Sequence, residues 1–455
     1  MTLPVSDAPR RGLGPVLSHP TRAVPLAFLA AMAIGTVLLM LPAARAGPDP
    51  APFVTALFTA TSAVCITGLI VVDTPTYWSP LGQAIILLLV QIGGLGIMTG
   101  STLLGLLVSR RLRLTTRLLA QAETRSVDLA DVGGVLRIVL GVTFGVELVT
   151  ALALAGWLHL GRGVPLPEAA WSGLFHSVAA FNNAGFSIHS DNVMGFARDG
   201  VFLTPIMLAS LIGGVGFPVL HELRREFATP ALWSVHTKIT LLGSALLLVG
   251  GAAAVLAYEW SNPATLGPMD LPGKLLGSVF HSVNTRSAGF NATDVGEMRT
   301  ETLMVSSLLM LVGGGSASTA GGIKLTTFLI LGLVVWAEIR GEPEVTAFRR
   351  RISAEVQRDA LAVALLALAT VSVASLALLS MTAFSLEDIL FETVSAFATV
   401  GLSTGITDDL PAAGQLLLVV LMFAGRVGTI TIATALALRH RPRPFRYPEE
   451  RPIVG

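Results

Sequence analysis

Four copies of one short pattern constrain the fold of this chain more than any other feature of the sequence. Each copy is a short apolar stretch that runs into polar residues and then into a glycine followed by Leu or Phe. The glycines, which lie 117, 104 and 112 residues apart, are Gly68, Gly185, Gly289 and Gly401. The matching phenylalanines, 10, 10, 9 and 10 positions earlier, are Phe58, Phe175, Phe280 and Phe391. A repeat of this period predicts four similar units around a shared axis.

The composition indicates a membrane protein. Hydrophobic residues make up 53% of the chain and charged residues only 13%, whereas a soluble globular protein usually carries about 25% charged residues. We read eight long apolar segments, most of them long enough to cross a hydrocarbon core of roughly 30 Å, at approximately 24–41, 80–108, 134–158, 201–221, 237–258, 302–337, 360–381 and 414–438. No basic stripe with aromatic residues is present, so we expect no nucleic-acid partner. The single cysteine allows no internal disulfide.

Each glycine pattern falls between the two members of a pair of long segments. The apolar stretch before it has about a dozen residues, which is too short to span a bilayer and is typical of a re-entrant half-helix. We therefore predict an all-α membrane protein with four M1–pore loop–M2 repeats around a pseudo-four-fold central pore. The predicted boundaries are an N-terminal arm at 1–23, repeats at 24–118, 119–230, 231–350 and 351–440, and a tail at 441–455.

The distribution of positive charge predicts the orientation. Most of the 30 Lys and Arg residues lie in the N-terminal arm, after the second, fourth and sixth segments, and in the tail. By the positive-inside rule, both termini are cytoplasmic and the four loops open to the outside. The first apolar run is too long for the hydrophobic region of a cleavable signal peptide, so we expect none.

The repeated loop is a candidate cation filter. Irregular backbone is tolerated at membrane depth only where it is buried in protein or lines a water-filled cavity. The loops have no acidic ring at the glycines, so backbone carbonyls would be the ligands, and the half-helix ends would favour a cation. The candidate filter residues are Ile66, Thr67, Gly68, Asn183, Ala184, Gly185, Ser287, Ala288, Gly289, Thr399, Val400 and Gly401. A single such glycine would indicate helix packing, but four copies in register favour a filter.

The sixth segment contains five glycines within residues 313–322. Each glycine destabilises a helix by about 1 kcal/mol relative to alanine, so we expect a break below the filter; a small-residue packing seam is the alternative. The candidate gate residues are Gly313, Gly314, Gly315, Ser316, Ala317, Ser318, Thr319, Gly321, Gly322, Lys324 and Arg426. An arginine within a membrane segment usually faces a partner or water. Our hypothesis is that Arg426 binds the 313–322 loop and places a positive barrier in the pore; Lys324 either acts similarly or extends to the interface.

Other polar residues also repeat. The position after the matching phenylalanine holds Thr59, His176, His281 and Glu392. We interpret the two histidines as structural hydrogen-bonding groups rather than pH sensors. Aspartates follow the glycines by 5, 6, 5 and 7 residues, at Asp73, Asp191, Asp294 and Asp408. They form either an acidic outer mouth that concentrates cations or ordinary solvated loop carboxylates. Arg286 is expected to brace its loop, and Glu147 is a lone intramembrane acid without an assigned partner.

The four loops also carry a family resemblance. Residues 61–69 and 71–74 closely resemble the first pore loop of bacterial potassium uptake subunits of the Trk/Ktr superfamily, and residues 181–187, 286–291 and 398–403 resemble the other three loops. The resemblance covers about residues 20–440 and is greatest to the Ktr-type membrane subunit, which lacks the extra N-terminal helix pair of Trk-type subunits. It implies K⁺ as the permeant ion, an inner-membrane homodimer, a cytosolic nucleotide-binding regulatory ring, and a gate formed by the 313–322 loop.

The loops depart from those of potassium channels. None reads Thr-Val-Gly-Tyr-Gly, so we expect fewer ordered ion sites and weaker K⁺/Na⁺ discrimination. An alternating-access cation symporter is a rival interpretation, although such proteins usually have two inverted repeats. An intramembrane enzyme is a weaker rival, because no catalytic motif is present and we expect no enzymatic activity. No nucleotide-binding motif or covalent cofactor signature is present either, so any nucleotide would act through a separate subunit. The sequence leaves open the need for Na⁺ and the identity of the nucleotide.

Overall fold

The computed structural model describes residues 20–111 and 132–428. The predicted arm and tail, the boundary between the first two repeats, and many of the arginines used to orient the chain therefore lie mostly outside the described residues. The helices of the first two predicted repeats are α2 (Pro20–Leu39), α3 (Phe53–Val64), α4 (Thr74–Tyr77), α5 (Pro80–Arg111), α7 (Val132–Gly156), α8 (Leu166–Phe181), α9 (Gly200–Val215) and α10 (Phe217–Glu226).

The helices of the last two predicted repeats are α11 (Val235–Glu259), α12 (Leu271–Asn284), α13 (Thr300–Leu311), α14 (Leu325–Arg340), α15 (Ala354–Met381), α16 (Leu386–Ala398) and α17 (Ala412–Phe423). Short 3₁₀ or π turns are η1 (Pro42–Ala44), η2 (Trp157–Gly161), η3 (Met194–Phe196), η4 (Pro230–Leu232) and η5 (Ala424–Gly428). The two-residue strands β1 (Thr346–Ala347) and β2 (Arg350–Arg351) form a small antiparallel hairpin. The predicted all-α architecture is confirmed apart from this hairpin.

The four short helices that precede the glycine loops are α3, α8, α12 and α16, and they contain between 12 and 16 residues. Their starts follow from the sequence. Pro52 and Pro165 precede α3 and α8, while the side chains of Asp270 and Ser385 accept hydrogen bonds from the first turns of α12 and α16. Such N-caps typically stabilise a helix by about 1 kcal/mol. All four helices end directly before a candidate filter loop.

The longer helices surround these half-helices. Four described helices are long and apolar enough to cross a membrane, namely Pro80–Gly100, Leu136–Gly161, Val235–Glu259 and Ala354–Met381. Of the other predicted segments, the described parts of the first and last are the apolar helices Val24–Leu39 and Ala412–Gly428, and the sixth divides into α13 and α14. The break of the sixth segment is as predicted, whereas the fourth segment differs from its prediction.

The fourth segment is not the continuous span expected over 201–221. Helices α9 and α10 meet at an angle of 97°, and the bend lies at Gly216, whose φ is +99°. Glycine reaches this conformation without steric penalty, and Pro218 lies in the first turn of α10, where its missing amide N–H leaves no helical hydrogen bond unmade. The bend turns α10, which carries Arg224 and Arg225 in its last turn, away from the axis of α9.

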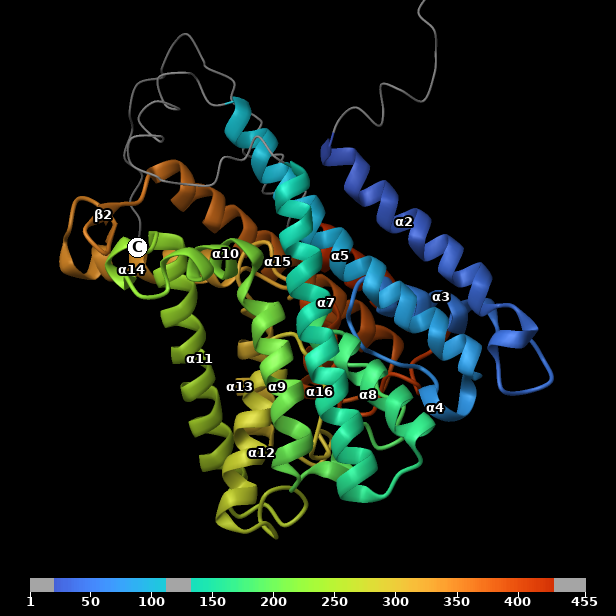
Figure 1. Ribbon diagram of the computed structural model, residues 1–455. Coiled ribbons are helices and arrows are strands. Elements are labelled where there is room, and N and C mark those ends of the chain that lie inside the picture. The colour runs from blue at the N-terminus through green and yellow to red at the C-terminus, as the bar shows by residue number, and fades with distance from the viewer. Residues whose placement is uncertain (1–19, 112–131, 429–455) are drawn as a thin grey trace, which may run out of the picture.

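The four groups of helices form a closed cycle. Helix α5 contacts α7 and α8, α9 contacts α12, α13 contacts α16, and α17 contacts α3. The last of these contacts joins the fourth group to the first, so segments at opposite ends of the sequence pack together. In Figure 1, α2 lies at one side of the molecule and α11 at the other.

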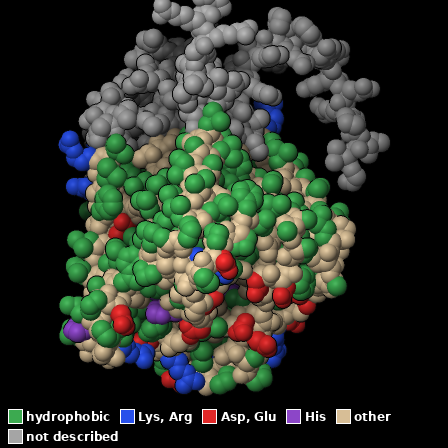
Figure 2. Space-filling view, turned by 90° about the vertical axis from the view of Figure 1, so that its right-hand side faces the viewer, with side chains coloured by type: hydrophobic (Ala, Val, Ile, Leu, Met, Phe, Trp, Pro, Cys, Tyr) green, Lys and Arg blue, Asp and Glu red, His purple; other side chains and the backbone are tan. Residues whose placement is uncertain are grey.

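The outer surface of the helices is hydrophobic. On α7, for example, Leu148, Val149 and Leu152 are 60%, 69% and 65% exposed. Figure 2 shows hydrophobic side chains across the middle of one face, with most of its Asp and Glu side chains gathered below them. A broad exposed apolar surface of this kind indicates contact with lipid rather than with water.

Candidate functional site

The four repeated glycines meet in a closed ring at the centre of the molecule. A Cβ atom placed on Gly68 would overlap the carbonyl oxygen of Ala184, and one on Gly185 would lie 3.1 Å from the carbonyl oxygen of Ala288. In the same rotational order, Gly289 abuts the carbonyl of Val400, and Gly401 abuts that of Thr67. Each glycine therefore faces the residue immediately before the glycine of the next loop. One rule holds at all four contacts, as a pseudo-four-fold axis requires.

The loops share an unusual backbone conformation. All four glycines have positive φ, between +65° and +95°. The residue two positions before each glycine also has positive φ, at Ile66, Asn183, Ser287 and Thr399. Non-glycine residues in this region are uncommon and are each strained by about 1–3 kcal/mol. Alternation of left-handed residues with ordinary ones can direct successive carbonyls to the same side, as a filter lined by carbonyls needs.

Buried side chains hold the loop amides in place. Ser62 Oγ accepts a hydrogen bond from Gly68 N at 3.0 Å, and Ser395 Oγ accepts one from Gly401 N at 3.1 Å. These two serines were not among the predicted site residues. The signal was nevertheless present, because each serine lies six positions before its glycine.

The third loop, which is one residue shorter, is held differently. The Asn284 carbonyl accepts hydrogen bonds from both Ala288 N and Gly289 N, and its side-chain Oδ1 accepts one from Phe290 N at 3.0 Å. One asparagine therefore replaces the serine anchor and compensates for the missing residue. Its role also was not predicted.

A cavity of about 340 Å³ lies directly beyond the glycine ring. Its lining includes the ring glycines Gly68, Gly185 and Gly401 and all four aspartates that follow the loops, Asp73, Asp191, Asp294 and Asp408. We call this cavity the vestibule. The sequence left two interpretations of these aspartates open, and their convergence on one cavity favours the acidic mouth. Within the described residues, no cluster of three or more His, Cys, Asp or Glu side chains could hold a metal ion.

On the opposite side of the ring, the 313–322 loop folds back between α13 and α14. Gly313 N donates to Ile323 O, and Leu325 N donates to Gly314 O. The loop rests on the bend between α9 and α10: Gly315 N donates to Gly214 O at 2.9 Å, and Phe217 N donates to Ala317 O at 3.3 Å. The bend that sequence reasoning missed thus supplies the partners that this freed backbone needs.

The 313–322 loop also contacts the candidate filter loops directly. The side chain of Asn183 lies 2.8 Å from the hydroxyl of Thr319 and is hydrogen-bonded to it. Ser287 Oγ accepts a hydrogen bond from Gly321 N at 3.0 Å and donates one to Thr399 O at 3.1 Å. Three filter loops and the glycine-rich loop are therefore joined in one hydrogen-bonded network.

Both predicted basic gate residues lie against this loop. Arg426, which is 2% exposed, donates a hydrogen bond from Nη1 to the carbonyl oxygen of Thr319. Its Nε and Nη2 have no protein partner. Lys324 Nζ donates to Ala320 O at 2.6 Å. The structure thus places a guanidinium group and an ammonium group within the candidate gate, on carbonyls of the same loop.

The other predicted polar residues lie outside the glycine ring. Arg286 points to α11, where it donates to the backbone and hydroxyl oxygens of Ser244. His176 is hydrogen-bonded to Ser187, and His281 to Ser306, each at 2.9 Å. Glu147 accepts hydrogen bonds from Gln91 and Asn182, and Asn182 is the residue that ends α8. These contacts give Glu147 the partners that sequence reasoning did not identify.

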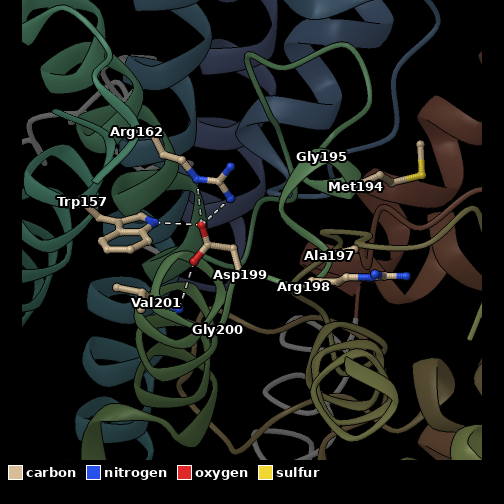
Figure 3. A pocket seen from close by; sticks show the side chains of 9 residues that line it. All are labelled: Trp157, Arg162, Met194, Gly195, Ala197, Arg198, Asp199, Gly200 and Val201. Atoms are coloured by element: carbon tan, nitrogen blue, oxygen red, sulfur yellow. Dashed lines mark hydrogen bonds and ion pairs between the residues drawn. The ribbon is translucent and has the colours of Figure 1, made fainter. Parts of the chain in front are cut away.

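A second cavity, of about 550 Å³, lies at the start of α9 (Figure 3) and contains none of the filter residues. Arg162 and Trp157 both donate to Oδ2 of Asp199, and Arg162 does so at 2.7 Å. The other carboxylate oxygen of Asp199 caps α9. Burial raises the pKa of Asp199, but these hydrogen bonds outweigh burial and hold the pKa below its usual range. Both carboxylate oxygens of Asp199 thus accept hydrogen bonds, and the residue stabilises the start of α9.

Residues 17–445 match the family described as TrkH, cation transport protein. The chain belongs to the TrkH family. The resemblance to Trk/Ktr subunits is therefore confirmed, and the expectation that the chain is a transport protein rather than an enzyme agrees with the family.

Several TrkH-family relatives cover almost the whole chain. The chain is 39% identical to the Ktr system potassium uptake protein B of Bacillus subtilis, covering 96% of this chain and 97% of that protein. It is 32% identical to the potassium/sodium uptake protein NtpJ of Enterococcus hirae, with coverage of 96% and 97%. The crystal structure of the potassium transporter TrkH from Vibrio parahaemolyticus shares the fold, with a TM-score of 0.69, 16% identity and coverage of 92% and 84%.

Proposed function

We propose that this TrkH-family chain takes up K⁺ across the bacterial inner membrane. The names of its relatives as potassium uptake proteins support the choice of ion. The observation that carries the proposal is the glycine ring, because four loops with the same backbone conformation surround one axis. The carbonyls of the candidate filter residues replace the hydration shell of the ion there. With one glycine in each loop instead of two, the discrimination between K⁺ and Na⁺ is weaker than in potassium channels.

The gate of this proposal is the 313–322 loop. It lies between the filter and the α9–α10 bend, and its carbonyls hold Arg426 and Lys324. Two positive groups below the filter oppose the passage of a cation through Coulomb repulsion. Opening requires the loop to leave the axis, and its hydrogen bonds to Ser287 and Asn183 let such a movement reach the filter.

The proposed assembly is a homodimer in lipid with both termini in the cytoplasm. A cytosolic subunit regulates the gate. This subunit binds the nucleotide, because the chain has no nucleotide-binding motif of its own. Helix α10 leads directly from the loop support at Gly216, and its last turn, which carries Arg224 and Arg225, is a docking surface for that subunit. The proposed role of Na⁺ is that of a second permeant ion or of a coupling ion.

The test is K⁺ uptake by cells that lack their own potassium transport, with alanine placed on the ring. Gly68→Ala and Gly401→Ala each put a Cβ onto a neighbouring carbonyl at a residue with positive φ. An alanine in that backbone region costs roughly 1–2 kcal/mol before any overlap is counted. We expect uptake to fall by at least about tenfold, which corresponds to about 1.4 kcal/mol.

Gly250→Ala is the matched control. It lies in α11, and a Cβ placed there has no atom within 4 Å; its uptake should equal that of the wild type. Normal uptake by the ring variants, at normal amounts of protein in the membrane, would exclude the filter assignment. Flux that is stoichiometrically coupled to a second ion, instead of following the electrochemical gradient, would favour the alternating-access symporter.

A further inference from the structure

The fourth half-helix carries a buried carboxyl group that has no counter-charge. Glu392 of α16 is 0% exposed. Its Oε1 accepts a hydrogen bond from the hydroxyl of Thr407, and its Oε2 has no partner. A carboxylate in such a place is expensive unless a cation or a proton neutralises it.

The charged groups around α16 do not supply a cation. Those close enough to act on Glu392 are acidic, namely Asp388 and Asp408. Helix α16 packs against α13, α15, α17 and η5. Within these elements, α17 has no charged residue, and Glu301 lies exposed in the first turn of α13.

The ionisable groups of α15 and η5 are directed elsewhere. Helix α15 meets α16 where Ser375 contacts Thr393, and its charged residues, the last of which is Asp359, lie about four helical turns away. Arg426 of η5 lies near the C-terminal end of α16, because the neighbouring Gly425 abuts Phe397. Its guanidinium group binds Thr319 instead of Glu392. No basic side chain of the described residues therefore neutralises Glu392.

A short chain of hydroxyl groups connects this carboxyl group to the vestibule. Thr407 bonds Glu392, and Ser403 Oγ lies 2.9 Å from Thr407 Oγ1. Both Ser403 and Thr407 line the vestibule. Each link is an O–H···O hydrogen bond, and Thr407 is the donor to Glu392. A proton therefore enters by successive transfers, from water in the vestibule to Ser403, from Ser403 to Thr407, and from Thr407 to Oε1 of the carboxylate. Release follows the same links in reverse, after the two hydroxyl groups have rotated.

The other three repeats lack an equivalent acid. The matching positions hold Thr59, His176 and His281, and His176 bonds Ser187, which follows its glycine by two residues just as Ser403 does. Loops 2 and 4 lie opposite each other in the ring. Repeat 4 thus alone carries a carboxyl group at this position of its half-helix. The other buried acid near a loop of the ring, Glu147 behind loop 2, differs because both of its oxygens accept hydrogen bonds from side-chain amides, those of Gln91 and Asn182.

We propose that Glu392 is a proton-binding site which exchanges with the outer vestibule and sets the affinity of the fourth filter loop for K⁺. With the proton bound, the group is neutral and the filter binds K⁺ more weakly. With the proton released, a negative charge lies behind the loop and strengthens K⁺ binding. At an effective dielectric constant of about 20, a unit charge roughly one helix diameter from a monovalent cation changes its binding by about tenfold. The inference rests on the proposed function, because it concerns the same filter.

The test measures initial K⁺ uptake, in the same cells and with the full chain, at external pH values from about 5.5 to 8.5. In the wild type, the apparent KM for K⁺ should fall by roughly tenfold between acid and alkaline medium, with at most one decade per pH unit as one-proton linkage requires. Glu392→Gln keeps an acceptor for Thr407 but carries no charge. It should show the acid value of KM at every pH.

His281→Gln is the matched control, since His281 is buried at the same position of repeat 3 but bonds α13 instead of the vestibule; it should keep the wild-type profile. Thr407→Val is the second variant, in case Glu392→Gln does not reach the membrane, and it should move the transition to more alkaline pH by about one unit because the carboxylate loses its donor. A wild-type KM that does not change with pH would overturn the proposal. A Glu392→Gln variant whose KM for K⁺ changes with pH as in the wild type would also overturn it. So would a variant whose KM still changes with pH but no longer changes with Na⁺.

The two proposals fail in different ways. Uptake by Glu392→Gln at alkaline pH shows that the filter works, whatever the pH profile turns out to be. Normal uptake by Gly68→Ala contradicts the filter itself and leaves the pH profile of Glu392→Gln to be judged separately.

Discussion

At the scale of single residues, the site depends on backbone conformations that the type of side chain does not predict. Glycine at 68, 185, 289 and 401 is an evident choice for positive φ. Ile66 and Thr399 are β-branched, yet they adopt φ values of +56° and +49°. Such residues avoid this region unless the surroundings impose it. Here the surroundings that impose it are the ends of the half-helices and the serines that hold the amides of Gly68 and Gly401.

Ser287 joins the third loop of the glycine ring to the 313–322 loop. Ser287→Ala removes the acceptor of Gly321 N and the donor to Thr399 O. A buried polar group that loses its partner costs about 1–3 kcal/mol, so the closed position of the 313–322 loop should be destabilised. We expect basal K⁺ flux in proteoliposomes to rise by roughly five- to tenfold, with reduced K⁺/Na⁺ discrimination in reversal potentials.

Ser307→Ala is the corresponding control, because Ser307 bonds only a carbonyl of its own helix. It should leave both the flux and the reversal potential unchanged. If Ser287→Ala behaves like this control, the hydrogen bonds of Ser287 do not couple the gate to the filter.

At the scale of elements, two helix breaks act together. The glycines of 313–322 predicted one break from helix propensity alone. The break at Gly216 was missed because the apolar run continues across it, although Gly216 followed two residues later by Pro218 was a usable signal. The first break leaves backbone groups that need partners, and the second provides them through Gly214 and Phe217. Neither segment would be stable at membrane depth without the other.

Arg426→Ala tests the gate at this scale. The variant removes a charge-assisted hydrogen bond to Thr319, which contributes about 1.5–3 kcal/mol, together with the positive barrier. Flux in proteoliposomes should therefore increase by on the order of tenfold. Arg340→Ala, at the exposed end of α14, should have no effect. Lower flux in well-folded Arg426→Ala protein would show that the arginine holds the pore open instead of closed, and equal flux would show that it has no part in the gate.

At the scale of the whole molecule, the four unequal repeats build one acidic vestibule over one ring. Asp294 and Asp408 come from the third and fourth repeats and line the same cavity as Asp73 and Asp191. Clefts lined by charges of one sign raise the local concentration of counter-ions. His189, which also lines the vestibule, adds little positive charge, because burial lowers its pKa although Asp191 opposes that shift.

The double variant Asp294→Asn, Asp408→Asn tests this field. At an ionic strength of about 0.01 M, where the Debye length is about 30 Å, the KM for K⁺ uptake should rise by roughly two- to fivefold. In about 1 M of an impermeant salt the Debye length is about 3 Å, and the difference from the wild type should become small. Glu344→Gln, an exposed acid paired with Arg351 in the hairpin region, is the control. A difference that does not change with salt would indicate a local structural defect.

The half-helices, the glycine loops, the broken sixth segment and the family could all be inferred from the amino-acid sequence. These features are local, since helix propensity, hydrophobic length and glycine content act within a short stretch of chain. Which groups meet could be seen only once the helices were packed in three dimensions. The contacts of Gly68 with Ala184, of Gly315 with the α9–α10 bend, and of Glu392 with Thr407 join residues whose positions depend on how the helices pack. A periodic pattern gives the faces of a helix, but partners between elements follow from the closure of the four repeats into one ring.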